Sequence, residues 1–198
     1  ALPNGYDAHL INAVEEDKDP SFFHIVYTGL LTRNQAYPAF IQAIKNLADK
    51  KPIRFSLAGN IPSSIIKEIK EIVPDVEVHY RGYVSHHDAI KLMKSADLLV
   101  NFIFDGAQTE MISGKLLEYF ATQVPVLSLG NPNSTAGKFV TKGSCAEMIS
   151  PKNSKAIRTF VEMLYKATDL PKNECSDLPL WSREALTQRL IAEVLDRK

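Results

Sequence analysis

The residues most suited to chemistry lie in one short run that ends a buried strand and begins a helix. Ser113 and Gly114 stand immediately before Lys115, and Glu118 follows one turn later. Serine is a favoured helix N-cap, and the free N–H groups of a first helical turn attract phosphate. Lys115 adds a full positive charge, while Glu118 can accept hydrogen bonds from neutral hydroxyls such as those of a ribose. The run therefore predicts a phosphate site with a hydroxyl acceptor beside it.

A helix from Gly114 to about Gln123 is needed to hold these groups in place. At 100° per residue its side chains separate into a packing side and a polar side. The packing side holds Leu116, Leu117, Phe120 and Ala121, and the polar side holds Lys115, Glu118 and Tyr119. The apolar run 98–100 before it and the run that starts at Pro125 after it predict flanking strands.

The same strand–helix alternation extends over most of the chain. Apolar runs predict strands at 23–27, 54–58, 76–80, 98–102, 125–129 and 146–149. Helical periodicity predicts helices at 37–49 and 65–73, one capped by Ser85, a short one near 138–141, one at 154–166 and one capped by Ser182. We expect an α/β protein with a Rossmann-like open parallel sheet of about six strands and helices on both faces. In such a sheet ligands bind at the carboxyl ends of the strands.

Composition narrows the class of protein further. The 198 residues carry 23 Lys plus Arg and 23 Asp plus Glu, so no net field attracts nucleic acid or an acidic membrane. Cys145 and Cys175 are too few and too far apart for a disulfide framework, which favours a reducing compartment. No run of 18 apolar residues and no signal peptide is present in the sequence.

Three segments are expected along the chain. Residues 1–20 are polar and turn-rich and predict a linker or a surface excursion. Residues 21–166 hold the alternating strand–helix pattern and are expected to form the Rossmann-like domain. Residues 167–198 contain Pro171 and Pro179 and predict a connector followed by a C-terminal helix.

Several residues have a plainer interpretation than a catalytic one. Glu110 and Glu118 taken alone could be a solvated loop residue and the ion-pair partner of Lys115. The adjacent His86 and His87 diverge and have no further ligand at metal-binding spacing, so no metal site is predicted. Neither cysteine has a recognisable base partner for nucleophilic catalysis. No Rossmann glycine fingerprint and no P-loop are present.

The run from 110 to 127 resembles the Glu-x7-Glu donor-site motif of GT-B glycosyltransferases, especially the retaining enzymes of family four. It reads Glu110-Met-Ile-Ser-Gly-Lys-Leu-Leu-Glu118-Tyr-Phe-Ala-Thr-Gln-Val-Pro-Val-Leu. Further segments resemble the strand exits and terminal helix of that family in the same order: 27–29 with Arg33-Asn34, 57–59, 80–84, 96–100 and 181–183. The resemblance extends over nearly the whole chain, and it implies the C-terminal, donor-binding half of a two-domain enzyme.

The resemblance also implies roles for individual residues. Glu118 would hold the ribose hydroxyls, Lys115 and Arg33 the donor diphosphate, and Glu110 the transferred sugar. The backbone around Tyr83 and Val84 would contact the base. The remaining implied binding residues are Gly29, Asn60, Ser113, Gly114 and Leu116. The family's usual aromatic-Gly pair after the first Glu is replaced by Met111-Ile112, and its usual Arg and Lys after the first strand are reduced to Arg33.

The implied function is transfer of a hexose from a nucleotide diphosphate sugar to a glycan or lipid-linked acceptor, with retention. No cofactor is expected, and the partners would be the nucleotide sugar and a missing N-terminal acceptor domain of the same polypeptide. Nucleic acid is not expected, and membrane contact would occur only through the missing half. The expected location is the cytoplasm, or the inner membrane surface for the full-length protein. Two alternatives stay open: a nucleotide-sugar epimerase of similar architecture, and a non-catalytic domain that binds a nucleotide or a partner. A glycosidase is less favoured because the two acids flank a phosphate-type helix start.

Overall fold

A computed structural model describes residues 4–45, 47, 51–104 and 111–195. Its centre is a six-stranded, wholly parallel sheet in the order β3-β2-β1-β4-β5-β6. The strands are β1 (Phe23–Thr28), β2 (Ile53–Ala58), β3 (Val76–Tyr80), β4 (Leu98–Phe102), β5 (Val126–Leu129) and β6 (Ala146–Ile149). The predicted Rossmann-like sheet is confirmed. Because the strand order reverses between β1 and β4, the carboxyl ends of these two strands border the crevice where such sheets bind ligands.

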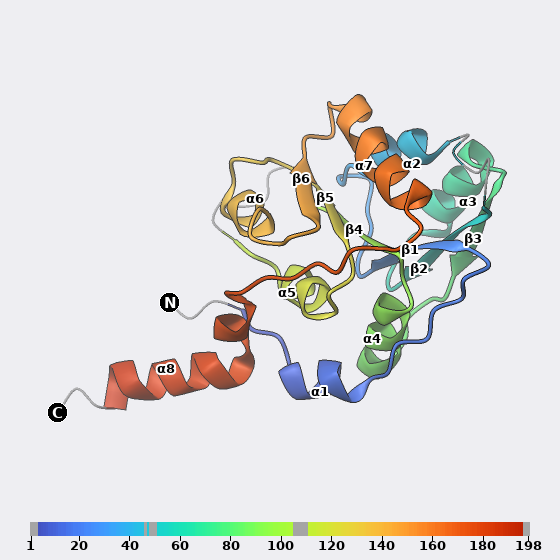
Figure 1. The fold of residues 1–198 in the computed structure, drawn as a ribbon. Coiled ribbons are helices and arrows are strands. Elements are labelled where there is room, and N and C mark those ends of the chain that lie inside the picture. Colours follow the sequence, from blue (N-terminus) through green and yellow to red (C-terminus); the bar gives the residue numbers. More distant parts are fainter. Residues whose placement is uncertain (1–3, 46, 48–50, 105–110, 196–198) are drawn as a thin grey trace.

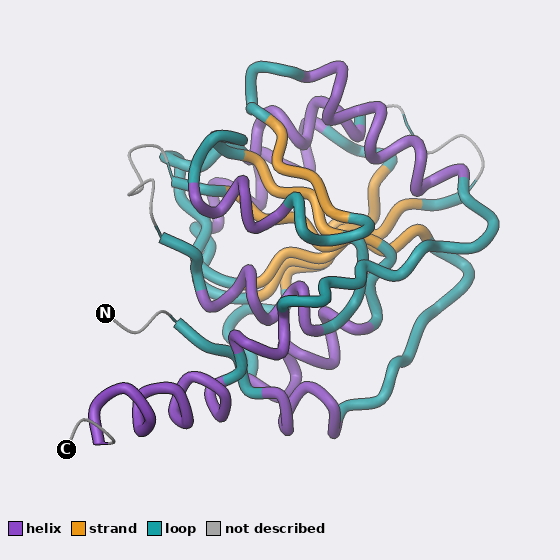
Figure 2. Tube along the Cα trace, turned by 60° about the vertical axis from the view of Figure 1, so that its left-hand side comes forward, coloured by secondary structure: helices purple, strands orange, loops and turns teal. Residues whose placement is uncertain are grey.

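Helices cover both faces of this sheet (Figure 1). They are α1 (Ala8–Ala13), α2 (Tyr37–Ile44), α3 (Ser63–Ile72), α4 (His86–Lys94), α5 (Gly114–Ala121), α6 (Thr135–Val140), α7 (Ser154–Lys166), the 3₁₀-helix η1 (Leu178–Trp181) and α8 (Arg183–Leu195). One face packs against α2, α3 and α7, and the other against α4, α5, α6 and α1. The view in Figure 2 shows the sheet enclosed between these two helical layers.

Each face of the sheet has its own apolar core. On the α2 side, the Phe40 ring lies 5.7 Å from that of Phe55 and 5.8 Å from that of Phe102, centroid to centroid. On the α5 side, Phe139 lies 4.8 Å from Phe120 and 5.5 Å from Trp181. Such aromatic pairs add to the area that the sheet buries. The two cores fix the strand ends and the start of α5 as one rigid frame.

Three local predictions need correction. Tyr119, expected on the polar side of its helix, is fully buried, because its hydroxyl meets the Thr28 N–H at 2.9 Å and so needs no water. Helix α2 ends at Ile44 rather than near Asp49, since Lys45 leaves the helical backbone region. Helix α3 begins at Ser63 rather than at Ile65, and its N-cap, Pro62, makes no side-chain hydrogen bond.

The segment expected as a linker contains structure where it is described. Asp7 caps α1, with its carboxylate accepting from the Leu10 N–H at 3.0 Å, and Ile11 and Val14 are buried in the second core. Tyr6 pairs with the other end of the chain, because its N–H donates to Trp181 O at 3.2 Å and its carbonyl accepts from Arg183. The predicted segment boundaries at 20 and 167 stay predictions.

Helix α8 extends away from the body of the domain (Figure 1). Its first turn is anchored, because Ser182 Oγ accepts from the Ala185 N–H at 3.1 Å, as predicted for this cap, and Leu186 is buried. Further along, Leu190 and Ile191 are 39% and 47% exposed. Within the described residues, no helix is both long enough and apolar enough to cross a bilayer.

Candidate functional site

Three glycine turns end the strands at one edge of the sheet. Gly29, Gly59 and Gly82 follow β1, β2 and β3 with φ angles of +121°, +123° and +66°. They are linked side by side, because the Gly29 N–H donates to Ala58 O at 2.8 Å and the Gly59 N–H to Gly82 O at 2.7 Å. Positive φ is a conformation that glycine adopts without a Cβ clash. These turns let the chain reverse at the carboxyl ends of β1, β2 and β3 without a Cβ clash.

The start of α5 faces this edge after β4. Ser113 is its N-cap as predicted, and its Oγ accepts from the Leu116 N–H at 3.2 Å. The N–H groups of Gly114 and Lys115 have no partner within the helix, as in any first turn. Among the described residues, no atom lies within 4 Å of a Cβ placed on Gly114, so they leave the space beside this helix start open. The geometry is that of an anion site at a helix N-terminus.

Lys115 delivers a positive charge to the same place. Its ammonium lies 3.2 Å from the Tyr27 hydroxyl and 4.4 Å above the centroid of the Tyr27 ring. A Cβ on Gly29 would come within 2.9 Å of Lys115 Cε and Nζ, so the lysine occupies the space that this glycine leaves free. Burial lowers the pKa of the Lys115 amine from 10.5 to about 8, against the opposing effect of Glu118. An anion bound here would restore the charged form.

A hydrogen-bond network beneath Lys115 fixes its position. The Tyr27 hydroxyl donates to Leu30 O and accepts from Lys115, and Gln35 Nε2 approaches the same hydroxyl at 3.3 Å. Gln35 also donates to Phe102 O at 2.9 Å, which ties the loop after β1 to the end of β4. Burial raises the pKa of Tyr27 to about 12, so the hydroxyl keeps its proton at neutral pH.

Glu118, the predicted ribose acceptor, is bonded to a histidine from another helix. His86 Nε2 lies 2.9 Å from Glu118 Oε1, and the exposed fractions of the two side chains are 45% and 20%. His86 is the first residue of α4, directly after the Ser85 cap, whose Oγ accepts from the Asp88 N–H at 3.1 Å. The start of α4 therefore meets the polar side of α5 through this pair.

Other predicted residues lie further around the edge. Arg33, in the loop after β1, is 64% exposed and forms a 3.0 Å ion pair with Glu68 of α3. Asn60 is an exposed residue of the β2 exit, and its carbonyl accepts from the Leu31 N–H at 3.1 Å. Tyr83 is 92% exposed before α4, and Val84 is half-buried beside it. The structure thus groups Gly29 with the start of α5 and holds Arg33 toward α3.

A cavity of about 700 Å³ opens next to Lys115, at the ends of β4, β5 and β6. Ser113, Lys115 and Leu116 form one wall, and Gly130 and Lys152 belong to the opposite loops. Its apolar lining includes three unusually exposed side chains: Leu30, Phe104 and Met111. A volume in this range suits a small ligand with both polar and apolar parts.

Glu110 lies outside the described residues, so its predicted contact with the sugar stays a prediction. The Leu116 side chain is fully buried and its N–H already donates to Ser113, so it offers the crevice no free group. Among the residues that the structure describes, no cluster of three or more His, Cys, Asp or Glu side chains could hold a metal.

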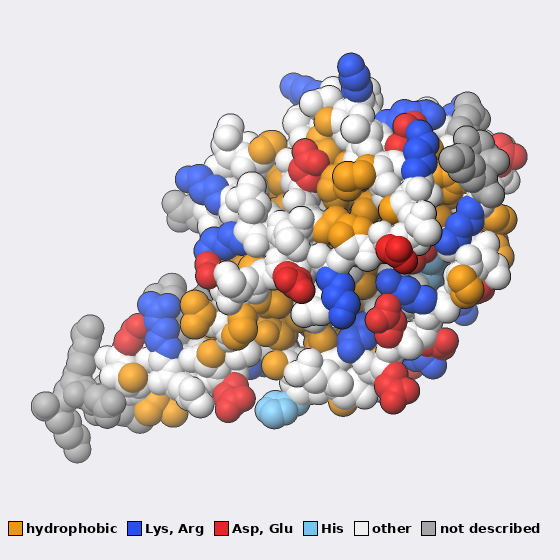
Figure 3. All heavy atoms as spheres, viewed as in Figure 1, with side chains coloured by type: hydrophobic (Ala, Val, Ile, Leu, Met, Phe, Trp, Pro, Cys, Tyr) orange, Lys and Arg blue, Asp and Glu red, His pale blue; other side chains and the backbone are white. Residues whose placement is uncertain are grey.

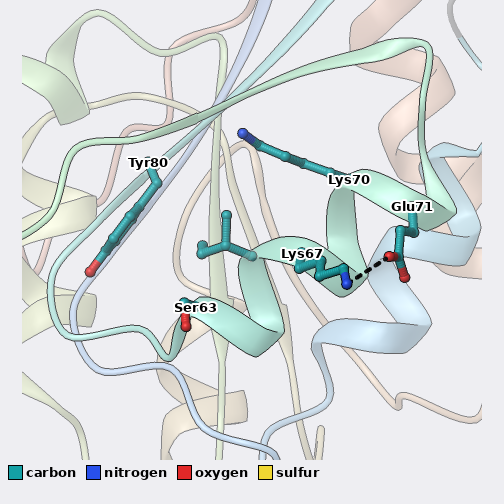
Figure 4. Close-up of a pocket in the computed structure, with 6 residues that line it drawn as sticks. Ser63, Lys67, Lys70, Glu71 and Tyr80 are labelled. Carbon is teal, nitrogen blue, oxygen red and sulfur yellow. Dashed lines mark ion pairs between the residues drawn. The ribbon is translucent and has the colours of Figure 1, made fainter.

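A separate groove lies on the far side of α3, at the β3 edge of the sheet (Figure 4). Lys67 and Glu71 form a 3.8 Å ion pair along its wall, and Tyr80 borders it. This groove holds none of the predicted site residues. Lys67 therefore carries a surface charge that is not part of the predicted site. On the face shown in Figure 3, positive and negative side chains are interspersed, in keeping with the zero net charge.

Sequence reasoning missed Tyr27, Gln35 and His86 as members of the site. Tyr27 was assigned only to a strand, and His86 only to the set of histidines unsuited to metal binding. A usable signal was present for His86, because it follows the Ser85 cap of a helix that begins just after a strand end. That position places a side chain at the carboxyl edge of a parallel sheet.

The match to a known protein family covers most of this chain. Residues 23–167 match the model of the family described as glycosyl transferases group 1. The chain belongs to this glycosyltransferase family. The matched residues include the glycine turns, Lys115 and Glu118, so the crevice described above lies within the family domain. No curated protein sequence is similar enough to match the chain.

Solved structures of glycosyltransferases share the fold. Anabaena Alr3699/HepE, crystallised with UDP and glucose, has a TM-score of 0.72 and 17% identity over 100% of this chain and 56% of its own. Sucrose-phosphate synthase from Thermosynechococcus elongatus has a TM-score of 0.71 and 13% sequence identity, and the match covers 100% of this chain and 53% of the synthase chain. A glycosyltransferase from Rickettsia africae has a TM-score of 0.68 and 14% sequence identity, and the match covers 100% of this chain and 57% of that chain. The glycosyltransferase chain described here thus spans about half the length of these structures.

Proposed function

We propose that this chain is the C-terminal, donor-binding half of a retaining, family-four type GT-B glycosyltransferase. The whole enzyme would move a hexose from a nucleotide diphosphate sugar to a glycan or lipid-linked acceptor. The observation that supports this most is the Lys115 ammonium lying over Gly29 beside the open start of α5. UDP is the first nucleotide to test, because the Alr3699/HepE structures contain it.

The proposed transfer reaction mainly requires that the negative charge on the leaving diphosphate be neutralised. A nucleoside diphosphate is a good leaving group, and negative charge grows on its phosphate oxygen as the bond to the sugar breaks. Fixed donors aimed at that oxygen stabilise the transition state most. In this proposal the N–H groups of Gly114 and Lys115 and the Lys115 ammonium supply them. Glu118 binds the ribose hydroxyls, Tyr83 and Val84 border the base, and Glu110 contacts the sugar.

Arg33 is the proposed second cation, and it must first leave Glu68. Both side chains of this pair are partly exposed, at 64% and 31%. Exposed ion pairs contribute at most about 1 kcal/mol, so a diphosphate can compete for the guanidinium. The loop that carries Arg33 starts at Gly29, which Lys115 contacts, so release from Glu68 would leave the guanidinium on the same loop as this glycine.

A thermal-shift panel of UDP, GDP, ADP and dTDP tests the proposed function. We expect a dissociation constant roughly between 1 mM and 1 μM for the matching nucleotide. At about 100 times that constant, ligand binding should raise the free energy of unfolding by about 2.7 kcal/mol and the Tm by roughly 5–10 °C. If none of the four nucleotides raises the Tm, a non-catalytic domain is favoured. If a full-length version consumes donor without acceptor, an epimerase is favoured.

The affinity for UDP should fall as the pH rises above 8. Diphosphate binding needs the charged form of Lys115, whose pKa is about 8 in the unliganded protein. The charge is present below that pKa and lost above it, so affinity should drop about tenfold from pH 7 to pH 9. Calorimetry at fixed ionic strength measures the change. The Lys115→Met variant should bind weakly at every pH in this range; an equal slope in that variant would assign the pH dependence to another group.

Replacing Gly114 by alanine should separate binding from stability. The new Cβ meets no atom of a described residue within 4 Å, so the Tm should stay the same or rise slightly as helix propensity improves. The same Cβ would stand over the helix start and keep a phosphate from the Gly114 N–H, at a cost of about tenfold in UDP affinity. Paired thermal and calorimetric measurements check both. Full affinity in this variant would mean that the backbone does not bind the diphosphate.

The remaining parts of the assignment concern the whole enzyme. We propose that an N-terminal domain of the same polypeptide binds the acceptor across the crevice. In keeping with this, Leu30, Phe104 and Met111 present apolar surface at the crevice mouth. We place the enzyme in the cytoplasm, or at the inner membrane surface through that other half, and assign it no cofactor, metal or nucleic-acid partner.

A further inference from the structure

We propose that His86 is a positioning residue for Glu118, fixing the carboxylate in the orientation that receives the ribose of the donor nucleotide. This inference rests on the proposed function, because it concerns the same crevice. The observation behind it is the 2.9 Å contact between His86 Nε2 and Glu118 Oε1, which joins the start of α4 to the polar side of α5.

The direction of this hydrogen bond follows from the two groups. An ionised carboxylate only accepts, so the proton lies on His86 Nε2. Each carboxylate oxygen has two lone-pair positions, and the histidine uses one of them on Oε1. In the part of the chain that the structure describes, Oε2 receives no hydrogen bond or ion pair. Glu118 therefore keeps enough acceptor capacity for two hydroxyl groups while its carboxylate plane is fixed.

Glu162 shows what a saturated carboxylate looks like in the same molecule. Its Oε1 lies 2.6 Å from Arg158 Nε, and its Oε2 lies 3.2 Å from Lys166 Nζ, so cations occupy both oxygens. The Glu118 side chain is 20% exposed, compared with 28% for Glu162, and yet only one of its two oxygens has a partner among the described residues. Partial desolvation makes an open acceptor costly unless a ligand uses it.

The pair is not needed to hold the two helices. Helix α4 is anchored by buried Ile90 and Met93 and by its Ser85 cap. Helix α5 is anchored by the buried side chains Leu116, Leu117, Tyr119 and Phe120. An exposed carboxylate–histidine contact adds little to the free energy of unfolding. Removal of His86 should therefore leave the fold intact and act on Glu118 alone.

The adjacent histidine provides a matched control. His87 stands on the same helix and is 61% exposed, but its ring pairs with Asp88 at 3.7 Å and not with Glu118. Replacement of either histidine removes one imidazole from the same turn. His86→Gln retains an amide N–H donor at a similar reach and serves as the conservative variant.

The test measures three ligands by calorimetry on the wild-type chain and on His86→Ala, His86→Gln and His87→Ala. UDP contacts both the proposed diphosphate site at the start of α5 and the proposed ribose acceptor Glu118. 2′-Deoxy-UDP lacks one ribose hydroxyl, and inorganic pyrophosphate reaches only the helix start and Lys115. We expect His86→Ala to weaken UDP binding about 3- to 10-fold, the worth of one oriented hydrogen bond. Pyrophosphate binding and the Tm should not change.

The deoxynucleotide separates positioning from a general structural role. In the wild type, UDP should bind more tightly than 2′-deoxy-UDP, and His86→Ala should reduce that ratio while His86→Gln restores part of it. His87→Ala should match the wild type for all three ligands. Unchanged or tighter UDP binding in His86→Ala, an unchanged ratio, or an equal loss for pyrophosphate would overturn the inference. If the wild type binds pyrophosphate but binds no nucleotide more tightly than pyrophosphate, the proposed function fails as well.

Discussion

Replacing Lys115 by methionine is expected to weaken UDP binding about 10- to 100-fold. A hydrogen bond to a charged group contributes roughly 1.5–3 kcal/mol, and each 1.4 kcal/mol corresponds to tenfold in affinity. Lys115 supplies a cation at the open helix start, with its ammonium over Gly29. Methionine keeps an apolar stem over the Tyr27 ring, so the loss reports charge rather than packing.

Calorimetry with UDP and with pyrophosphate measures this loss directly. Both ligands should lose affinity, in contrast to the His86 variants, because both carry the diphosphate. Lys67→Met is the control: this lysine lies in the groove on α3 and pairs with Glu71 (Figure 4). It should bind both ligands as the wild type does. Equal affinities of Lys115→Met and the wild type would show that the diphosphate binds elsewhere.

Replacing Gly59 by alanine is expected to cause the largest loss of stability among these variants. At φ +123°, the new Cβ would lie 2.2 Å from the Gly29 carbonyl oxygen, which is far inside contact distance. The Gly29 backbone cannot move freely, since its N–H donates to Ala58 O at 2.8 Å. Backbone strain of about 1–3 kcal/mol and overpacking of about 1–3 kcal/mol add to roughly 2–6 kcal/mol.

Thermal unfolding should show this as a Tm lower by roughly 5–20 °C. Gly82→Ala is the matched control, because Gly82 also has positive φ, at +66°, but a Cβ there has no neighbour within 4 Å in the part of the chain that the structure describes. The free energy of unfolding of Gly82→Ala should fall only by the cost of the backbone strain, about 1–2 kcal/mol. Similar melting temperatures for the two variants would mean that the β1 and β2 exits are not held as close as described.

The local elements of the fold were predictable from the sequence. Six strands, the Ser113 cap of α5, the Ser85 cap of α4 and the bounds of α7 were all expected and are confirmed. These features depend on side chains within four residues of one another, which a single sequence displays directly. The burial of Tyr119 was mispredicted because a helical wheel counts a hydroxyl as polar. In the structure the Thr28 N–H, at the end of β1, donates a hydrogen bond to this hydroxyl.

The candidate site was only half predictable for the same reason. Gly114, Lys115 and Glu118 follow one another on a single helix, so their grouping could be inferred before any fold was known. The residues that hold them come from elsewhere: Tyr27 is 88 positions from Lys115, and His86 is 32 positions from Glu118. Arg33, expected beside Lys115, is instead held toward Glu68 on α3.

The sequence by itself determined that strands alternate with helices and that a capped, cationic helix start follows the fourth strand. The tertiary structure decided which strand ends border that helix and which side chains fix its charges. Strand order places β1 beside β4, which brings Tyr27 under Lys115 and the start of α4 next to Glu118. Periodicity and capping are local properties of the chain, whereas these pairings depend on how distant segments pack, and no local pattern encodes that.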